Sequence, residues 1–175
     1  MEEQTVPIHA SPARALDGGA RFEDLFHAQR DRLCSALWLL TRDRHEAEEI
    51  AQEAFVRVWE RWDRRGAPDD AVGYLFRTAM NVMRNRRRRA AVALRRATGS
   101  EEGPDELAAV EAREEIVRAL GSLTPRQRAA IVLVDLLDMS SSEAARALGV
   151  RASTVRVLAA RGRAVLAERI GVRDD

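Results

Sequence analysis

Apolar residues recur every three to four positions through most of the chain, as they do in helices that bury one face. The first such run contains Phe22, Leu25, Phe26, Leu33, Leu37 and Leu40. The second contains Ala47, Ile50, Ala51, Ala54, Phe55, Val58 and Trp59. No segment shows the strict alternation of apolar and polar residues that is typical of a strand. The sequence therefore predicts an all-α fold class.

Local signals mark where several of these helices begin. Capping boxes, in which two side chains satisfy backbone N–H groups reciprocally, are predicted at Asp43/Glu46, Thr124/Gln127 and Ser140/Glu143. Between residues 62 and 70 the helical pattern breaks, which predicts a loop. Either Asp69 or Asp70 is then expected to cap a third helix that runs into an arginine-rich stretch.

One segment reads as a linker between domains. Residues 98–105 contain two glycines, one proline and no apolar side chain. We predict two small helical bundles joined by a flexible acidic linker. Their expected ranges are a disordered tail at 1–20, a first bundle at 21–96, the linker at 97–109, a second bundle at 110–170 and a short tail at 171–175.

The distribution of charge is more informative than the formal net charge of +1. Residues 77–96 carry eight arginines and no acidic residue, whereas residues 101–115 carry seven acidic residues against one arginine. Residues 43–60 are acidic and residues 146–169 are basic again. Alternating blocks of this size predict separate surfaces that meet different partners.

Several functional classes are disfavoured. The only cysteine is Cys34, and the three histidines, His9, His27 and His45, have no metal-ligand spacing. There is no phosphate-binding glycine loop and no cluster of catalytic side chains, so we expect neither an enzyme nor a bound metal or cofactor. No apolar run reaches the ~20 residues of a membrane span. These features predict a cytoplasmic, soluble protein without membrane insertion.

Within the second bundle, Ala145, Gly149 and Val155 have the spacing of a helix-turn-helix. The small residue permits close helix approach, glycine supplies the left-handed turn, and valine packs between the helices. An ordinary helical hairpin with a basic solvated face is the alternative. In a major groove, the outward residues of the second helix would contact DNA: Arg151, Ser153, Thr154, Arg156, Val157, Ala160, Arg161 and Arg163.

The arginine-rich helix of the first bundle shows a comparable phase. Its apolar face is predicted to contain Phe76, Ala79, Met80 and Met83. The opposite side then carries one nearly straight stripe, formed by Arg77, Asn81, Arg84, Asn85 and Arg88. A stripe in register with a buried face favours a shaped nucleic-acid surface over a loose polybasic tag, since arginine grips phosphates and asparagine can bond bases.

These motifs, in this order, resemble those of bacterial sigma factors of the extracytoplasmic-function type. The resemblance covers TRDRHEAEEIAQEAFVRVWERW, GYLFRTAMNVMRNRRRR and LTPRQRAAIVLVDLLDMSSSEAARALGV. It implies a non-enzymatic initiation factor that binds core RNA polymerase and promoter DNA, with the first bundle on the −10 element and the second on the −35 element. The alternative is a stand-alone helix-turn-helix transcriptional regulator, which predicts a dimer and a palindromic site.

The resemblance also assigns roles to residues and names partners. Residues implied to dock on the polymerase β′ clamp helices are Glu48, Glu49, Gln52, Glu53, Phe55 and Arg57. An acidic helix face of this kind suits a basic protein surface, although a merely solvated face would look the same. Residues Arg64, Arg65 and Gly66 fall in the loop implied to receive a flipped −10 base. The polymerase β flap and an anti-sigma factor are further partners that the family implies.

Three positions depart from the family pattern. Val157 and Leu158 replace a serine and an arginine of the recognition helix, and Val134 stands where relatives often carry an arginine. Fewer cationic contacts to the −35 backbone follow, and Val157 is suited to a thymine methyl group. We therefore expect ordinary −10 binding with an unusual −35 preference.

Overall fold

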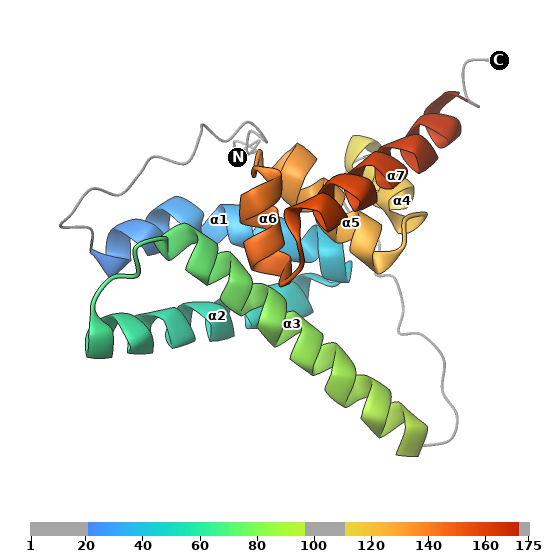
Figure 1. Cartoon of the computed structure of the whole chain (residues 1–175). Coiled ribbons are helices and arrows are strands. Elements are labelled where there is room, and N and C mark those ends of the chain that lie inside the picture. Colours follow the sequence, from blue (N-terminus) through green and yellow to red (C-terminus); the bar gives the residue numbers. More distant parts are fainter. Residues whose placement is uncertain (1–20, 97–110, 172–175) are drawn as a thin grey trace, which may run out of the picture.

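The computed structural model describes residues 21–96 and 111–171, and within these ranges every regular element is a helix (Figure 1). The first bundle contains α1 (Phe22–Thr41), α2 (Arg44–Arg65) and α3 (Ala71–Arg96). The second contains α4 (Glu111–Gly121), α5 (Pro125–Ile131), the π-helical turn η1 (Val132–Leu136), α6 (Ser141–Leu148) and α7 (Ala152–Gly171). The all-α prediction is confirmed. The predicted linker at 97–109, the tail at 1–20 and residues 172–175 lie outside the described residues.

The first bundle is built around the apolar faces that the sequence pattern indicates. Leu25, Leu33 and Leu37 of α1 are fully buried, as are Ile50 and Val58 of α2. Burying one such side chain contributes about 1.5–3 kcal/mol. One half of the capping box predicted at the start of α2 is present, since the Asp43 carboxylate accepts a hydrogen bond from the Glu46 N–H at 2.9 Å; the Asp43 N–H donates to the Thr41 hydroxyl and not to Glu46. These contacts fix the direction in which α2 presents its polar face.

The end of α2 corrects the sequence prediction, because the helix continues to Arg65 and the loop is shorter than expected. The indole of Trp62 packs edge-on against Phe22 with ring centroids 5.9 Å apart, and this tertiary contact holds the last turn in helical form. Gly66 then ends the helix with φ +74°, a conformation that favours glycine. Asp70 caps α3 as one of the two candidates, accepting from the Gly73 N–H at 2.8 Å.

The second bundle contains the predicted helix-turn-helix. Gly149 is left-handed (φ 67°), and its N–H bonds to the Ala145 carbonyl at the end of α6. Val155 of α7 is fully buried between the helices. The capping boxes at Thr124 and Ser140 are both formed. Val150, which directly follows the turn, is 41% exposed.

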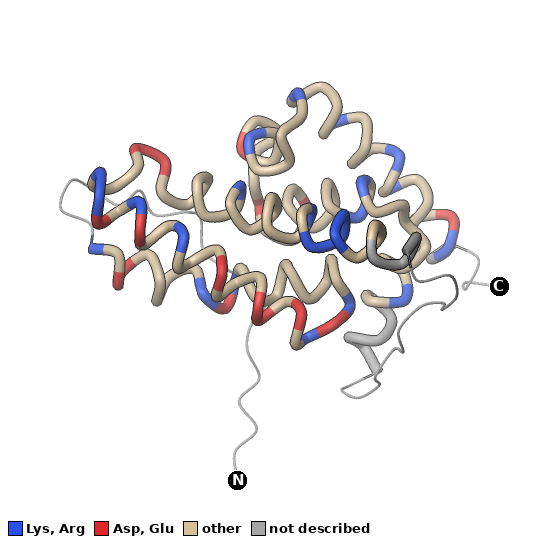
Figure 2. The backbone as a smooth tube through the Cα atoms, turned by 90° about the horizontal axis from the view of Figure 1, so that it is seen from below, with Lys and Arg blue, Asp and Glu red and all other residues tan. Residues whose placement is uncertain are grey.

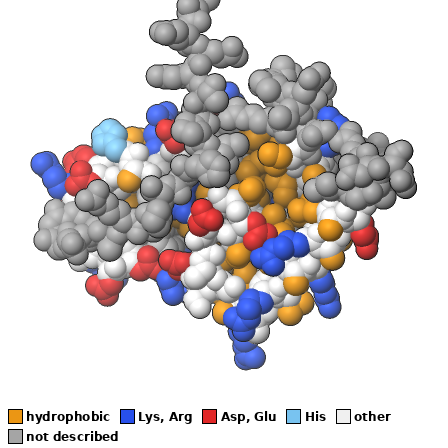
Figure 3. Space-filling view, turned by 90° about the horizontal axis from the view of Figure 1, so that it is seen from above, with side chains coloured by type: hydrophobic (Ala, Val, Ile, Leu, Met, Phe, Trp, Pro, Cys, Tyr) orange, Lys and Arg blue, Asp and Glu red, His pale blue; other side chains and the backbone are white. Residues whose placement is uncertain are grey.

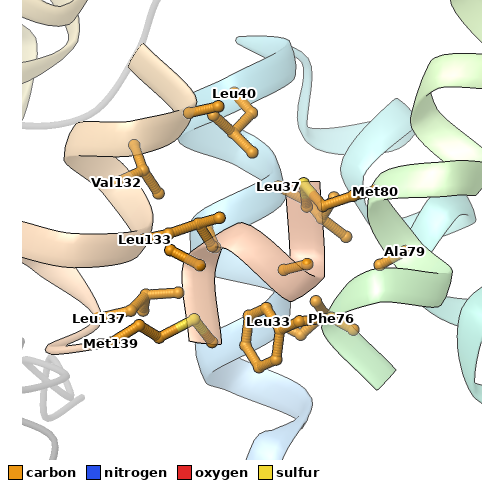
Figure 4. Packing of buried hydrophobic residues seen from close by; sticks show 14 of the residues in the cluster. Leu33, Leu37, Leu40, Phe76, Ala79, Met80, Val132, Leu133, Leu137 and Met139 are labelled. Atoms are coloured by element: carbon orange, nitrogen blue, oxygen red, sulfur yellow. The ribbon is translucent and has the colours of Figure 1, made fainter. Parts of the chain in front are cut away.

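The two bundles pack directly against one another. Helix α6 contacts α3, and η1 and α5 contact α1. Figure 4 shows side chains of both bundles converging, and the buried residues of the two bundles form one hydrophobic cluster. The sequence pattern predicts the apolar faces but does not show that some of them meet across the domain boundary.

Potential sites for other chemistry are few in the part of the chain that the structure describes. Its helices include none with the length and apolarity needed to cross a bilayer. Its His, Cys, Asp and Glu side chains form no group of three or more able to hold a metal ion. The thiol of Cys34 is partly buried, and this burial raises its pKa because it disfavours the thiolate.

Candidate polymerase and promoter interfaces

The acidic face of α2 is held in a network with arginines. The Arg86 guanidinium of α3 lies 2.6 Å from a Glu49 carboxylate oxygen and 3.1 Å from one of Glu53. Glu53 also pairs with Arg57, one turn further along α2, at 2.6 Å. Acidic positions recur along α2 beside the continuous arginine run of α3 (Figure 2). Two other predicted contact residues on this face, Gln52 and Glu48, are exposed, and Glu48 lies 3.2 Å from Arg44.

Arg86 and Arg87 make structural contacts between helices that the sequence analysis did not identify. The hydrogen bond with Glu49 is the largest cause of the net rise in the pKa of Arg86; burial opposes this rise, and the bond with Glu53 adds to it. Arg87 donates to the Leu40 carbonyl at 2.8 Å and so satisfies the C-terminal end of α1. Their position off the predicted stripe was the available signal, because it directs them toward α1 and α2.

The structure buries Phe55 and exposes Trp59, although the apolar pattern places both residues in the buried face of the helix. Phe55, implied as a polymerase contact, is only 5% exposed and packs against Phe26 with ring centroids 4.9 Å apart. It therefore lies in the core beneath the acidic face of α2 and is not part of that surface. Trp59, expected in the buried face, is 52% exposed, and Val56 beside it on the helix is 53% exposed. The pattern misleads here because two apolar residues lie outside the stripe that faces α1 and α3.

The last turn of α2 and the residue that follows it present the predicted loop residues to solvent. Arg64, Arg65 and Gly66 are all exposed, with Arg64 in the last helical turn, 3.4 Å from Glu60. The Gly66 carbonyl accepts a hydrogen bond from Arg61 at 2.8 Å. The hydrogen bond from Arg61 therefore holds the first residue of the loop in place. The positive charge here comes from Arg64 and Arg65 at the end of α2, next to the exposed backbone of Gly66.

The stripe on α3 is exposed along its whole length, while the opposite face is buried. Leu75, Phe76, Ala79, Met80 and Val82 are almost completely inaccessible. The exposed residues are Arg77, Asn81, Arg84, Asn85 and Arg88. The ring of Tyr74 lies between two cations, with the guanidinium carbon of Arg61 at 5.2 Å and that of Arg77 at 5.1 Å from its centroid.

Helix α7 and Arg151, the residue before it, expose all eight residues predicted to face DNA: Arg151, Ser153, Thr154, Arg156, Val157, Ala160, Arg161 and Arg163. Val155 and Ala159 point into the bundle. Figure 3, which views the side of the molecule that carries α6 and α7, shows arginines scattered among hydrophobic and uncharged side chains. Val157 is 48% exposed, so an apolar group is available on this surface.

Arg163 also has an intramolecular role. Its guanidinium makes two hydrogen bonds to the Asp135 carboxylate, at 3.0 and 2.8 Å, which raise the pKa of Arg163. Asp135 belongs to η1, and π-helical turns often occur at functional sites. This ion pair links α7 to η1. Val134 and Leu158, two of the departures from the family pattern, are partly buried.

Two protein families match the chain. Residues 25–92 match sigma-70 region 2, and residues 113–166 match sigma-70 region 4. These matches fall on the two bundles, and the second includes the helix-turn-helix. Together, in this order, they define the class of sigma-70-type promoter-recognition factors and favour it over a stand-alone helix-turn-helix regulator.

Curated relatives narrow the class. The chain is 35% identical over 163 residues to the ECF RNA polymerase sigma factor SigM of Mycobacterium tuberculosis, covering 86% of this chain and 77% of SigM. It is 31% identical over 163 residues to the sigma-E factor of Streptomyces avermitilis, covering 87% of each. Against SigE of Mycolicibacterium smegmatis it is 30% identical over 152 residues, covering 81% of this chain but only 58% of SigE. The chain therefore belongs to the extracytoplasmic-function (ECF) RNA polymerase sigma factors.

Solved structures agree with this fold. A sigma factor RpoE from Bartonella quintana, in complex with the anti-sigma factor NepR, matches with a TM-score of 0.71 and 21% identity, covering 87% of this chain and 98% of RpoE. CnrH, in complex with the cytosolic domain of CnrY, matches with a TM-score of 0.65 and 25% identity, covering 87% and 89%. Sigma factors bind core RNA polymerase and promoter DNA to initiate transcription, and they catalyse no reaction themselves.

Proposed function

We propose that this chain docks on core RNA polymerase through α2, engages the −10 element through α3 and the preceding loop, and engages the −35 element through α7. The proposed domains are region 2 at 21–96 and region 4 at 110–170, with residues 97–109 as linker. The observation that carries the proposal is the exposure of two arginine-bearing helix faces, one on each bundle, each opposite a buried face. Because polymerase and promoters lie in the cytoplasm, we place the protein there.

The α2 face suits a basic protein surface such as the β′ clamp helices. Glu49 and Glu53 are held in place by Arg86, so their carboxylates are ordered before a partner arrives. Exposed Trp59 and Val56 add an apolar contact beside the charges. Aromatic side chains often dominate the binding energy of an interface, and we assign Trp59 that role.

The α3 stripe suits a promoter strand with bases exposed. Its arginines grip phosphates, while Asn81 and Asn85 donate to and accept from base edges. The Tyr74 ring and Arg65 line the same cleft, and an extruded base can stack on this ring by taking the place of the Arg61 or Arg77 guanidinium. Extrusion costs a few kcal/mol, and stacking together with charge-assisted bonds offsets that cost.

The α7 helix is suited to the major groove of the −35 element. Ser153 and Thr154 lie in its first turn, where base edges are read, and Arg156 and Arg161 follow where phosphates are gripped. Exposed Val157 fits a thymine methyl group, and this favours an unusual −35 preference. We place the β flap as the partner of region 4, and an anti-sigma factor as a candidate inhibitor of both regions.

The test is reconstituted transcription with core polymerase and a library of promoters randomised at both elements. The proposal predicts specific initiation that requires a −10 and a −35 sequence, the latter different from that of typical relatives. Initiation from no promoter, or DNA binding to a palindrome without polymerase, would contradict it.

A further inference from the structure

The ion pair between Arg163 of α7 and Asp135 of η1 lies beside the helix proposed to read the −35 element. Residues 151–167 carry four arginines and no acidic residue. Asp135 comes from a different element, and in the part of the chain that the structure describes its carboxylate is the one that pairs with one of these arginines. A negative charge beside a phosphate-binding surface opposes DNA binding, so its place here needs a physical explanation.

Close packing of α7 on α5 brings the two groups together (Figure 1). A Cβ atom added at Gly162 would lie 2.8 Å from Cγ1 of Ile131, the last residue of α5, so glycine permits an approach that a larger residue would prevent. Arg163 is the next residue of α7, and Asp135 lies in the π-helical turn that follows Ile131. The packing of the second bundle therefore sets the pair, which is not a chance meeting of two surface side chains.

The π-helical turn holds Asp135 in place. Val132 and Leu133 at the start of the turn are fully buried, so the backbone there is anchored in the core. The Leu137 N–H closes the wide turn by donating to the Val132 carbonyl at 3.0 Å. The side chain of Asp135 is left 31% exposed at the edge of the bundle, next to α7. Its carboxylate is thus presented to Arg163 from a rigid support.

The way Arg163 is held leaves part of its guanidinium available. Its Nε and Nη2 atoms donate to the two carboxylate oxygens of Asp135, at 3.0 and 2.8 Å. Its Nη1 atom has no hydrogen bond to another described residue, and the side chain is 55% exposed. Because a guanidinium carries five N–H donors in one plane, the donors of Nη1 remain for another acceptor. Arg163 can therefore hold Asp135 and a DNA phosphate at the same time.

A fixed arginine and an unrestrained one affect sequence readout differently. Phosphate contacts set the register of a protein on DNA. An unrestrained arginine can follow the backbone in many positions, so it adds affinity for any sequence. Arg163 held by Asp135 reaches a phosphate only where Ser153 and Thr154, in the first turn of α7, have the matching position in the groove. In other positions the backbone repels the Asp135 carboxylate without a compensating contact.

We propose that Asp135 is a specificity-determining residue of the −35 interface: it fixes Arg163 as a phosphate contact at one position, and its charge disfavours DNA bound in any other. This inference rests on the proposed role of α7 at the −35 element. Asp135 lies outside the recognition helix and acts through Arg163, so it is a positioning residue. Its removal should raise affinity for DNA of any sequence and lower the discrimination between correct and incorrect −35 elements.

The test measures sequence-independent affinity and −35 selectivity separately. Binding of the full chain to a random-sequence duplex is followed by fluorescence anisotropy at several salt concentrations. Initiation by the full chain with core polymerase is measured on promoters with an intact or altered −35 element. For Asp135→Asn we expect duplex affinity to rise about fivefold, the salt slope to rise by about 0.9, and the ratio of initiation from intact over altered promoters to fall about fivefold. Unchanged selectivity would overturn the proposal.

Two further variants separate positioning from charge. Arg163→Lys keeps the charge but cannot make the two-point contact with the carboxylate, so selectivity should fall about fivefold while duplex affinity stays within about twofold. Asp138→Asn is the matched control, because it removes an exposed acid three residues further on, where the left-handed backbone (φ 51°) also suits asparagine. It should keep the selectivity of the parent chain. A fall in selectivity with Asp135→Asn alone, or an equal fall with Asp138→Asn, would reveal a general charge effect and overturn the proposal.

Folding and the proposed function are checked on the same samples. Circular dichroism shows whether each variant keeps the helical content of the parent chain. Should Asp135→Asn fail to fold, Arg163→Lys carries the test, and unchanged selectivity in it overturns the proposal. If the parent chain initiates equally from intact and altered −35 promoters, the proposed role of α7 fails and the inference with it. Selectivity that the parent chain and both pair variants share overturns the inference alone.

Discussion

The two helices proposed to contact DNA, α3 and α7, use arginine differently. On α3, Arg84, Arg86 and Arg87 each bond to another helix of the protein. On α7, only Arg163 does so among the arginines that the structure describes there, and Arg156 and Arg161 are exposed without such a partner. Some arginines on α3 therefore stabilise the fold while others lie on its exposed surface, whereas most arginines on α7 lie on the exposed surface and make no hydrogen bond with another helix.

This difference shows that the charge of an arginine run does not reveal which of its residues stabilise the fold and which are available to a partner. Adjacent residues of α3 point to different neighbours because each step along a helix turns the side chain by about 100°. Arg86 and Arg87 face α2 and α1, while Arg88 faces solvent. Substitutions on α3 should therefore give mixed effects on stability and function, and those on α7 should separate the two.

The largest effect is expected from removing the ring of Phe76, which is fully buried where α3 meets α1 and α6. Phe76→Ala should lower the free energy of unfolding by about 3–5 kcal/mol, since it leaves a cavity. All three tryptophans lie in the first bundle, so urea denaturation followed by tryptophan fluorescence measures it there. Val92→Ala on the same helix, at 44% exposure, is the control and should change little. A loss below about 1 kcal/mol for Phe76→Ala would contradict the shared core.

On α7, Arg156→Ala should weaken −35 DNA binding about tenfold and leave stability unchanged. The slope of affinity against salt should fall by about 0.9, because one phosphate contact is lost. Arg163→Ala is the comparison, and it should also lower stability, since Asp135 loses its partner. Fluorescence anisotropy at several salt concentrations gives the affinities, and circular dichroism gives the stability. Equal stability losses for both variants would refute the distinction between Arg156 as a surface residue and Arg163 as a residue that stabilises the fold.

On α3, Arg86→Gln should destabilise the first bundle by about 1 kcal/mol, the upper end for exposed pairs, because two carboxylates share one guanidinium. Polymerase affinity should fall as well, since Glu49 and Glu53 lose the contact that orders them. Arg89→Gln, exposed and without such a contact, is the matched control. Urea denaturation and a polymerase pull-down titration measure the two effects. Indistinguishable results for both variants would mean that Arg86 is an ordinary surface charge.

The smallest effect concerns the cap of α6. Hydrogen bonds from Ser140, side chain first and then backbone, hold the pKa of Glu143 below its ordinary value of 4.5. A folded pKa below the unfolded one stabilises the protein above that value and loses this contribution as pH falls through the folded pKa. Glu143→Gln should therefore cost about 0.5–1 kcal/mol at neutral pH and less near pH 3. Urea denaturation at both pH values measures it, and a pH-independent difference would contradict the charged cap.

Local features of the fold could be predicted from sequence because their causes are local. The caps at Asp43, Thr124 and Ser140, and the turn at Gly149, need only a few neighbouring residues. The end of α2 could not, since Trp62 is kept helical by Phe22 from another helix. The η1 turn could not be predicted either, because it follows α5 directly and the apolar pattern continues across the boundary between them.

Predictions of the site followed the same division. The exposed stripe of α3 and the exposed face of α7 follow from helical phase alone. The buried position of Phe55 follows from helical phase, whereas the exposure of Trp59 depends on how α2 is rotated against α1 and α3, which phase alone does not determine. Arg84 bonds to Leu148, 64 residues away along the chain, and Arg86 bonds to Glu49, 37 residues away. Only the tertiary structure brings these partners together.

The central claim is that the phase of α3 makes its stripe a promoter surface. Arg88 and Arg89 test it most directly, because they are adjacent, exposed and alike in charge, while only Arg88 lies on the stripe. Initiation by reconstituted polymerase is measured for Arg88→Ala and Arg89→Ala on a promoter with an intact or altered −10 element. We predict about a tenfold loss for Arg88→Ala and less than about twofold for Arg89→Ala. Equal losses would show that the stretch acts as a nonspecific charge patch.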